Sequence, residues 1–167
     1  MKNDYCDMDL VIKERWRKAL LSGEYQQHIF ERMRHEDNGK FTFSALGVLC
    51  DIFQKETGRK VNWWRREIPR SVREWAGLHA SAIYISTPTP LENPQGRTGK
   101  LLLCSRQYLE EHWRSYGWSE TEILHELGCH RYWRTLQEWS VVWQLKFSDI
   151  AFLLEFGTID GFRKWKR

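Results

Sequence analysis

Long apolar runs are missing from this sequence of 167 residues. A helix that crosses a bilayer needs about 20 consecutive, mostly apolar residues, so we expect no membrane-spanning segment and no membrane partner. The first residues are polar and lack the apolar stretch of a secretory signal. We therefore expect a soluble protein that stays in the cytoplasm.

Closely spaced cysteines are also missing. The four cysteines, Cys6, Cys50, Cys104 and Cys129, lie far apart and form no CxxC pair. This spacing matches no common zinc motif, and it argues against a disulfide framework, which is typical of short secreted chains. We expect reduced and mostly buried thiols.

Motifs that carry catalysis or hold cofactors are lacking as well. The sequence contains no Walker phosphate loop, no GxGxxG fingerprint and no GxSxG elbow. The segment from His125 to His130 resembles a metalloprotease helix, but its second histidine stands one position too late and Gly128 is expected to end the helix. We therefore predict no enzyme activity, no cofactor and no metal site.

Tryptophan, by contrast, is abundant, and the net charge is mildly positive. The charge of +4 permits an anionic partner but is too small to indicate a dense DNA-binding surface. Some tryptophans must be buried, and others are free to take part in binding. The ten tryptophans are Trp16, Trp63, Trp64, Trp75, Trp113, Trp118, Trp133, Trp139, Trp143 and Trp165.

Hydrophobic periodicity and turn residues predict one α+β domain over residues 1–167, with a mixed or antiparallel sheet packed by several helices. Residues 160–167 are expected to form a frayed tail. The predicted helices span residues 9–22, 45–57, 69–76, 105–116, 119–127 and 147–154, and the predicted strands span residues 28–34, 40–43, 82–85, 101–103 and 138–143.

Turn and capping chemistry supports several of these elements. The dipeptide Asn38-Gly39 predicts a tight β-hairpin turn. Ser44 can cap the helix that follows it, and the apolar face of that helix should form the buried centre of the domain. Residues 87–99 hold three of the four prolines and are predicted to form an irregular loop that closes over a ligand.

Several segments carry a resemblance to known sequences. The run Ala45-Leu46-Gly47-Val48-Leu49-Cys50-Asp51-Ile52 and the earlier run 15–26 resemble small phage and prophage proteins of unknown function, which typically carry a "CLGVLCDL" helix. Residues 68–78 and 147–155 extend the similarity, whereas residues 100–143 depart as an apparent insertion. The resemblance implies a shared fold, a phage origin and a place in the cytoplasm of the host bacterium, but no chemistry.

The tetrapeptide at residues 63–66 is the most suggestive candidate for a ligand site. Flat aromatic rings can stack on a base, and guanidinium groups can hold phosphate oxygens. The alternative is a strand with one buried tryptophan and solvated arginines. The predicted ligand-binding residues are Trp63, Trp64, Arg65, Arg66, Tyr84, Arg97 and Lys100.

Small phage accessory proteins often counter bacterial immunity. Together with the aromatic and basic residues, this origin predicts a counter-defence protein that sequesters an anionic nucleotide second messenger without catalysis. The ligand would be a cyclic nucleotide or an ADP-ribose-type signal. Two alternatives stay open: an inhibitor that binds a host defence protein, and a nucleic-acid-binding accessory protein with salt-sensitive affinity. We also expect a homo-oligomer.

Overall fold

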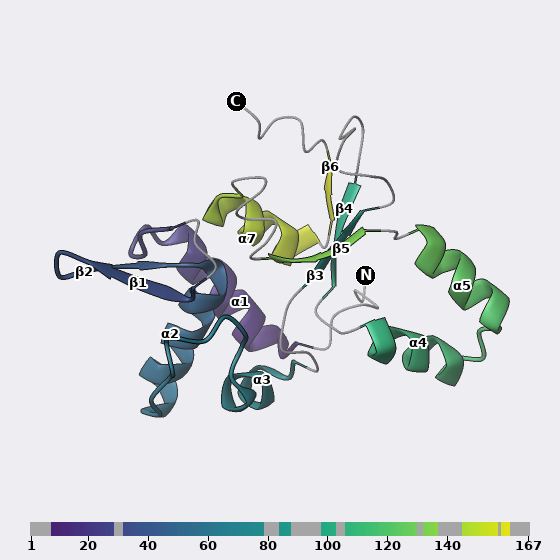
Figure 1. The fold of residues 1–167 in the computed structure, drawn as a ribbon, viewed down its shortest axis with the longest axis horizontal. Helices are drawn as coiled ribbons and strands as arrows, with labels where there is room; N and C mark the ends of the chain where they lie inside the picture. The colour runs from purple at the N-terminus through teal and green to yellow at the C-terminus, as the bar shows by residue number, and fades with distance from the viewer. Residues whose placement is uncertain are drawn as a thin grey trace.

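The chain forms helices and two β-sheets (Figure 1). The computed structural model describes residues 8–28, 32–78, 84–87, 98–102, 106–129, 132–136, 145–156 and 158–160. The strand pairs of both sheets are antiparallel, and the predicted α+β class is confirmed. The helices are α1 (Leu10–Leu21), α2 (Ala45–Thr57), α3 (Arg70–Ala76), α4 (Arg106–Ser115), α5 (Glu120–Cys129) and α7 (Phe147–Phe156); the strands are β1 (Arg34–Asp37), β2 (Lys40–Phe43), β3 (Tyr84–Thr87), β4 (Thr98–Leu102), β5 (Tyr132–Thr135) and β6 (Thr158–Asp160).

Helix α2 is the buried centre of the fold, as the sequence predicts. Every residue from 45 to 53 is buried. The Ser44 hydroxyl accepts a hydrogen bond from the N–H of Gly47 at 3.1 Å, and Gly58 ends the helix with a left-handed φ of 69°. The two caps set the helix boundaries locally, and the apolar residues between them hold it in the core.

Helix α1 packs against α2 and also against α7, so a helix near the start of the described chain contacts one near its end. Its Trp16 is fully buried and donates a hydrogen bond from Nε1 to the carbonyl of Ala45 at 2.9 Å. The side chain of Gln27, just beyond α1, accepts from the N–H of Phe147 at 2.8 Å and donates to the carbonyl of Leu145 at 2.6 Å. These bonds satisfy backbone groups at the start of α7.

Strands β1 and β2 form a hairpin around the predicted Asn38-Gly39 turn, but the predicted strand at 28–34 is wrong in its bounds, because β1 shares only Arg34 with it and continues to Asp37. Asn38 and Gly39 both have positive φ, 50° and 76°, which is the geometry of a two-residue turn that matches the twist of the strands. Glu36 pairs with Phe41 across the hairpin. Side chains of paired residues share one face of a sheet, so these two residues lie on the same face.

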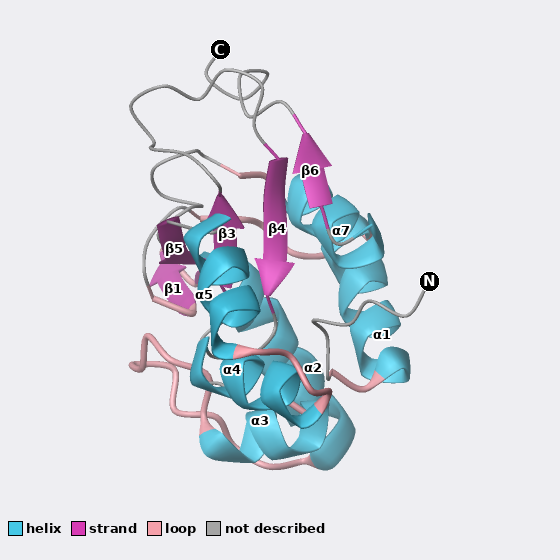
Figure 2. Cartoon of the chain, turned by 90° about the vertical axis from the view of Figure 1, so that its right-hand side faces the viewer, coloured by secondary structure: helices cyan, strands magenta, loops and turns pink. Residues whose placement is uncertain are grey.

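The second sheet has the order β5-β3-β4-β6, and Figure 2 shows β3, β4 and β6 beside one another. The predicted loop at 87–99 is wrong at both ends, because Thr87 belongs to β3 and Thr98 begins β4; residues 88–97 lie outside the described residues. Strands β5 and β6 were not predicted. The predicted strand at 138–143 lies outside the described residues.

Helix α5 opens as predicted but ends later than predicted. Ser119 and Glu122 form a reciprocal capping box, in which the N–H of Ser119 donates to Glu122 at 2.7 Å and the N–H of Glu122 donates to Ser119 at 3.2 Å. The prediction that Gly128 ends the helix is wrong, since α5 continues to Cys129. One interior glycine costs only about 1 kcal/mol relative to alanine, so it does not by itself stop a helix.

Gly47 is the position at which the hairpin meets α2. A Cβ atom on Gly47 would lie 1.8 Å from the carbonyl oxygen of Met33. That oxygen also accepts a hydrogen bond from the N–H of Ser44 at 3.0 Å, and the Met33 side chain is fully buried. The backbone of the chain entering β1 therefore rests directly on α2, where only glycine leaves room for it.

The variant Gly47→Ala is expected to lose about 3 kcal/mol or more of unfolding free energy, because the added methyl group forces the Met33 backbone away from α2. Denaturant unfolding measures the loss. Gly23→Ala is the matched control: its φ is 77° but nothing lies within 4 Å of its Cβ, so it should lose only the left-handed backbone cost of about 1–2 kcal/mol. Equal losses in the two variants would contradict the close-contact explanation.

Candidate functional site

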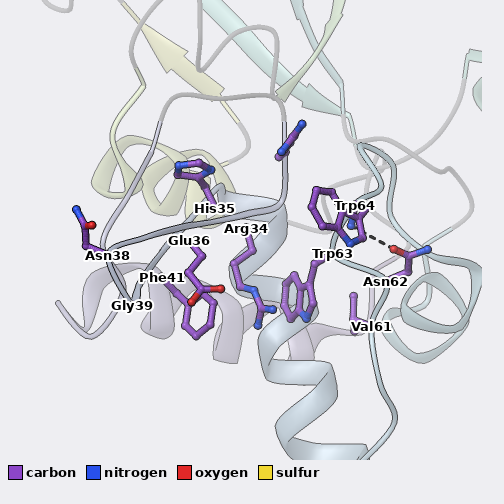
Figure 3. A pocket seen from close by; sticks show the side chains of 11 residues that line it. Arg34, His35, Glu36, Asn38, Gly39, Phe41, Val61, Asn62, Trp63 and Trp64 are labelled. Carbon is purple, nitrogen blue, oxygen red and sulfur yellow. Dashed lines mark hydrogen bonds between the residues drawn. The ribbon is translucent and has the colours of Figure 1, made fainter.

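A cavity of about 660 Å³ lies between the β1–β2 hairpin and the loop that follows α2 (Figure 3). We call it the hairpin cavity. Its volume falls in the range of about 300–1,000 Å³ that is common for small-molecule sites. Its lining residues are Arg32, Arg34, His35, Glu36, Asn38, Gly39, Phe41, Val61, Asn62, Trp63 and Trp64.

The hairpin supplies one wall of this cavity. Arg34 and Glu36 are two residues apart on β1, so their side chains leave the same face of the strand. Phe41 is the cross-strand partner of Glu36 and lies on that face as well. The pleat of a short hairpin thus gathers a guanidinium group, a carboxylate and an aromatic ring on one surface.

The loop after α2 supplies the opposite wall, and side-chain hydrogen bonds shape it. The N–H of Val61 donates to the side chain of Gln54 at 3.2 Å, which ties the loop to the helix. The N–H of Trp64 donates to Oδ1 of Asn62 at 3.2 Å, an Asx turn that Figure 3 marks with a dashed line. Trp63 packs edge-on against Phe43, with ring centroids 6.1 Å apart. The loop therefore presents both tryptophans to the cavity.

Arg34 links the two walls. Its Cζ lies 4.2 Å from the ring centroid of Phe41 and 4.3 Å from that of Trp63, so the guanidinium group is sandwiched between the two rings (Figure 3). Stacking uses the faces of a guanidinium group and leaves its in-plane N–H donors for other partners. Within the described part of the chain, no carboxylate forms an ion pair with Arg34. These donors suit an anionic group.

A second cation–aromatic pair lies in the same cavity. The Cζ of Arg32 is 5.4 Å from the ring centroid of Trp64, and Trp64 is 79% exposed. Trp63, by contrast, is partly buried and packs against the core. The two tryptophans therefore differ in role, because one is held by its neighbours and the other presents its ring to solvent.

The structure brings some of the predicted ligand residues together. Trp63 and Trp64 both line the hairpin cavity, in a turn rather than in a strand. Arg65 and Arg66 follow them and are exposed, but they do not line the cavity. The remaining predicted residues are not placed at a site: Tyr84 lies in β3 and Lys100 in β4, with side chains outside the described part, and Arg97 lies outside the described residues.

Sequence reasoning missed the hairpin side of the cavity. Arg32, Arg34, Glu36 and Phe41 were not among the predicted site residues, although the hairpin itself was predicted. The available signal was the alternation on β1, which places Arg34 and Glu36 on one face. What the sequence does not reveal is that this face meets the loop carrying Trp63.

A buried histidine lies beside the hairpin. His28 is 7% exposed, and its backbone N–H donates to the carbonyl of Phe43 at 3.0 Å. Burial lowers the pKa of His28 to about 4, and the charge of His35, which lines the cavity, adds to this lowering. The imidazole of His28 is therefore neutral at pH 7.

A second polar cluster joins the segment after α1 to α2. The Tyr25 hydroxyl donates to Asp51 at 2.7 Å, and Lys55 Nζ lies 2.7 Å from the same carboxylate oxygen. Burial and the bond to Asp51 raise the pKa of Tyr25, and the hydrogen bonds to Asp51 and Tyr25 raise the pKa of Lys55. Both groups keep their protons at neutral pH, so neither Tyr25 nor Lys55 is a general base, and their bonds to Asp51 tie the segment after α1 to α2.

Cys50 is equally unsuited to nucleophilic chemistry. Its Sγ is fully buried beside Met33 Sδ, at 3.3 Å, and burial raises the pKa of the thiol to about 12. Its thiolate is therefore scarce at pH 7, as the apolar helix predicts. Among the described residues, no group of three His, Cys, Asp or Glu side chains could hold a metal ion.

The fold and the cavity define a small α+β domain with an arginine–aromatic cavity between a β-hairpin and a loop. The chain belongs to a domain family of unknown function, DUF8296, whose sequence model matches residues 8–107. No curated protein and no solved structure matches the chain. The matched span contains the whole hairpin cavity, whereas α5, β5, α7 and β6 lie beyond it. None of the described helices is long and apolar enough to cross a membrane.

Acidification is expected to destabilise the fold through His28. The unfolded chain takes up a proton near pH 6.5 and the folded chain only near pH 4, so the unfolded state binds more protons between these values. The contribution of His28 is fully present above about pH 6.5 and is lost as the pH falls, by about 3 kcal/mol at pH 4. Unfolding of wild type and His28→Gln at pH 7 and pH 4 tests this, and an unchanged difference between the two proteins at both pH values would contradict it.

Proposed function

We propose that this protein binds and sequesters a small anionic nucleotide in the hairpin cavity, without catalysis, as a phage counter-defence protein. The ligand class is a cyclic nucleotide or an ADP-ribose-type signal in the cytoplasm of the host bacterium. The observation that carries the proposal is the guanidinium group of Arg34, which is held between Phe41 and Trp63 and forms no ion pair with a carboxylate of the described residues.

Preorganisation supports binding at this position. Ring stacking on both sides holds the Arg34 head group in one orientation before any ligand arrives. A ligand phosphate then meets two parallel N–H donors without the entropic cost of ordering a free arginine. The exposed ring of Trp64 adds a flat apolar surface in the same cavity, which suits a nucleobase.

The arrangement of the acidic and imidazole groups favours binding over reaction. His35 and Glu36 are neighbours on β1, so their side chains leave opposite faces of the strand. A proton-transfer pair must reach the same reacting atom. Both residues line the cavity, but they leave β1 on opposite faces, so the arrangement favours holding a ligand over proton transfer by this pair.

A protein partner is the second candidate. Helices α4 and α5 and the turn between them expose large apolar side chains, and almost all of this segment lies beyond the matched family span. Tyr116 is 73% exposed and Leu124 is 63% exposed. Trp118 stacks on the buried Trp113, with centroids 5.4 Å apart, and is itself exposed. Exposed aromatic residues are frequent anchors of protein interfaces, so this surface suits an inhibitor of a defence complex.

A nucleotide panel tests the proposal by thermal shift, with cyclic mono- and dinucleotides and ADP-ribose derivatives. A ligand at about 100 times its Kd should raise Tm by about 5–10 °C, and Arg34→Ala should abolish the rise. Arg70→Ala is the matched control, since Arg70 is exposed on α3 and, among the described residues, forms an ion pair with Glu74 at 2.6 Å.

The material released from the heated complex distinguishes the outcomes. Mass spectrometry should find the nucleotide intact. An altered product would mean that the protein is an enzyme and would overturn sequestration. The absence of a shift with every compound would favour the protein partner. Binding that falls steeply with salt and extends to long oligonucleotides would favour the nucleic-acid alternative.

A further inference from the structure

The two cation–aromatic pairs of the hairpin cavity are not equivalent. We infer that they orient the ligand, with its phosphate on the Arg34 guanidinium edge and its base on the exposed face of Trp64, and that Glu36 restricts the site to phosphate monoesters and diesters rather than triphosphates. This inference rests on the proposed nucleotide binding and assigns the ligand class and the role of each wall.

At Arg34, the rings of Phe41 and Trp63 already cover both faces of the guanidinium group. The Arg34 Cζ is about equally far from Phe41 and Trp63, at 4.2 and 4.3 Å. A nucleobase cannot stack on those ring faces without displacing the arginine. The N–H edge remains, and its planar fork matches two oxygens of a phosphate group.

The pair formed by Arg32 and Trp64 offers an exposed aromatic ring instead of an exposed guanidinium edge. Arg32 lies over the ring of Trp64 at 5.4 Å, yet 79% of Trp64 remains exposed. A large part of the indole surface is therefore available for stacking, while the backbone of Trp64 is held by the bond from its N–H to Asn62. A base that stacks here remains partly exposed to solvent, which predicts weak discrimination between bases.

The charge of the cavity sets the class of phosphate. Apart from His35, the titratable side chains in the lining are Arg32, Arg34 and Glu36, so two guanidinium groups and one carboxylate leave one net positive charge. Glu36 leaves the same face of β1 as Arg34. A monoester carries a charge of about −1.5 to −2 at pH 7, so binding leaves an excess of only about half to one negative charge, whereas a triphosphate brings further negative charge toward Glu36.

Calorimetric titration with adenosine, ribose 5-phosphate, AMP and ATP tests the orientation. Arg34→Ala should weaken AMP by about 10-fold or more and leave adenosine unchanged. Trp64→Ala should weaken AMP and adenosine alike, by about 5- to 100-fold, and leave ribose 5-phosphate unchanged. The reversed pattern, in which Trp64→Ala affects ribose 5-phosphate and Arg34→Ala affects adenosine, would overturn the orientation.

Glu36→Gln tests the charge rule separately. Wild type should bind AMP at least about 10-fold more tightly than ATP, and the variant should reduce this preference by tightening ATP. Glu74→Gln on the exposed face of α3 is the matched control and should change neither ligand. An unchanged preference in Glu36→Gln would overturn the role of Glu36.

The failures of the two proposals are distinguishable. If neither these compounds nor any member of the thermal-shift panel binds to wild type, the proposed function fails and the orientation falls with it. If AMP binds but the variants give the reversed pattern, nucleotide binding stands and the orientation alone is wrong. Glu36 and Trp64 are exposed, so their variants should fold; unfolding curves of all variants verify this, including Arg34→Ala.

Discussion

The close contact between the Met33 backbone and Gly47 is the constraint on which the candidate site depends. The Met33 carbonyl lies where a Cβ of Gly47 would stand, and it accepts the N–H of Ser44, the residue that caps α2. The Met33 carbonyl thus contacts both the cap of the central helix and its first turn, and this contact positions the chain that enters the hairpin. Arg34 is the next residue, so its direction follows from this contact.

The same arginine also provides cohesion. Phe41 belongs to the hairpin and Trp63 to the loop after α2, and the Arg34 guanidinium group touches both rings. A cation–π contact contributes roughly 0.5–2 kcal/mol, so the sandwich stabilises the walls of the cavity as well as presenting donors to it. A ligand that binds its N–H edge would reinforce contacts that already exist rather than create new ones.

The described structure divides the chain by role. The hairpin, α1, α2 and α3 lie within the matched family span and share the main buried core with α7, which lies beyond that span. Helices α4 and α5 pair with each other through the Trp113 and Trp118 region and carry exposed apolar residues. Exposed surface can vary without disturbing a core, so the cavity and the α4–α5 surface are physically separate features of the chain.

Local chemistry determined the parts that the sequence predicted well. Asn38-Gly39 sets its own turn, Ser44 and Gly58 bound α2, and the Ser119–Glu122 box opens α5, because each depends on neighbours within a few residues. Trp63 and Trp64 could be chosen from sequence for the same reason, since their aromatic faces and adjacent arginines are properties of one tetrapeptide.

Only the tertiary structure decided what those tryptophans face. Arg34 meets Trp63 across 29 positions of sequence through the docking of the hairpin on α2, and no local pattern encodes that approach. The strands β5 and β6 escaped prediction because they are short and are defined by pairing with β3 and β4. Residue types and caps are read along the chain, whereas a cavity exists only where distant segments pack together, and packing depends on the whole core.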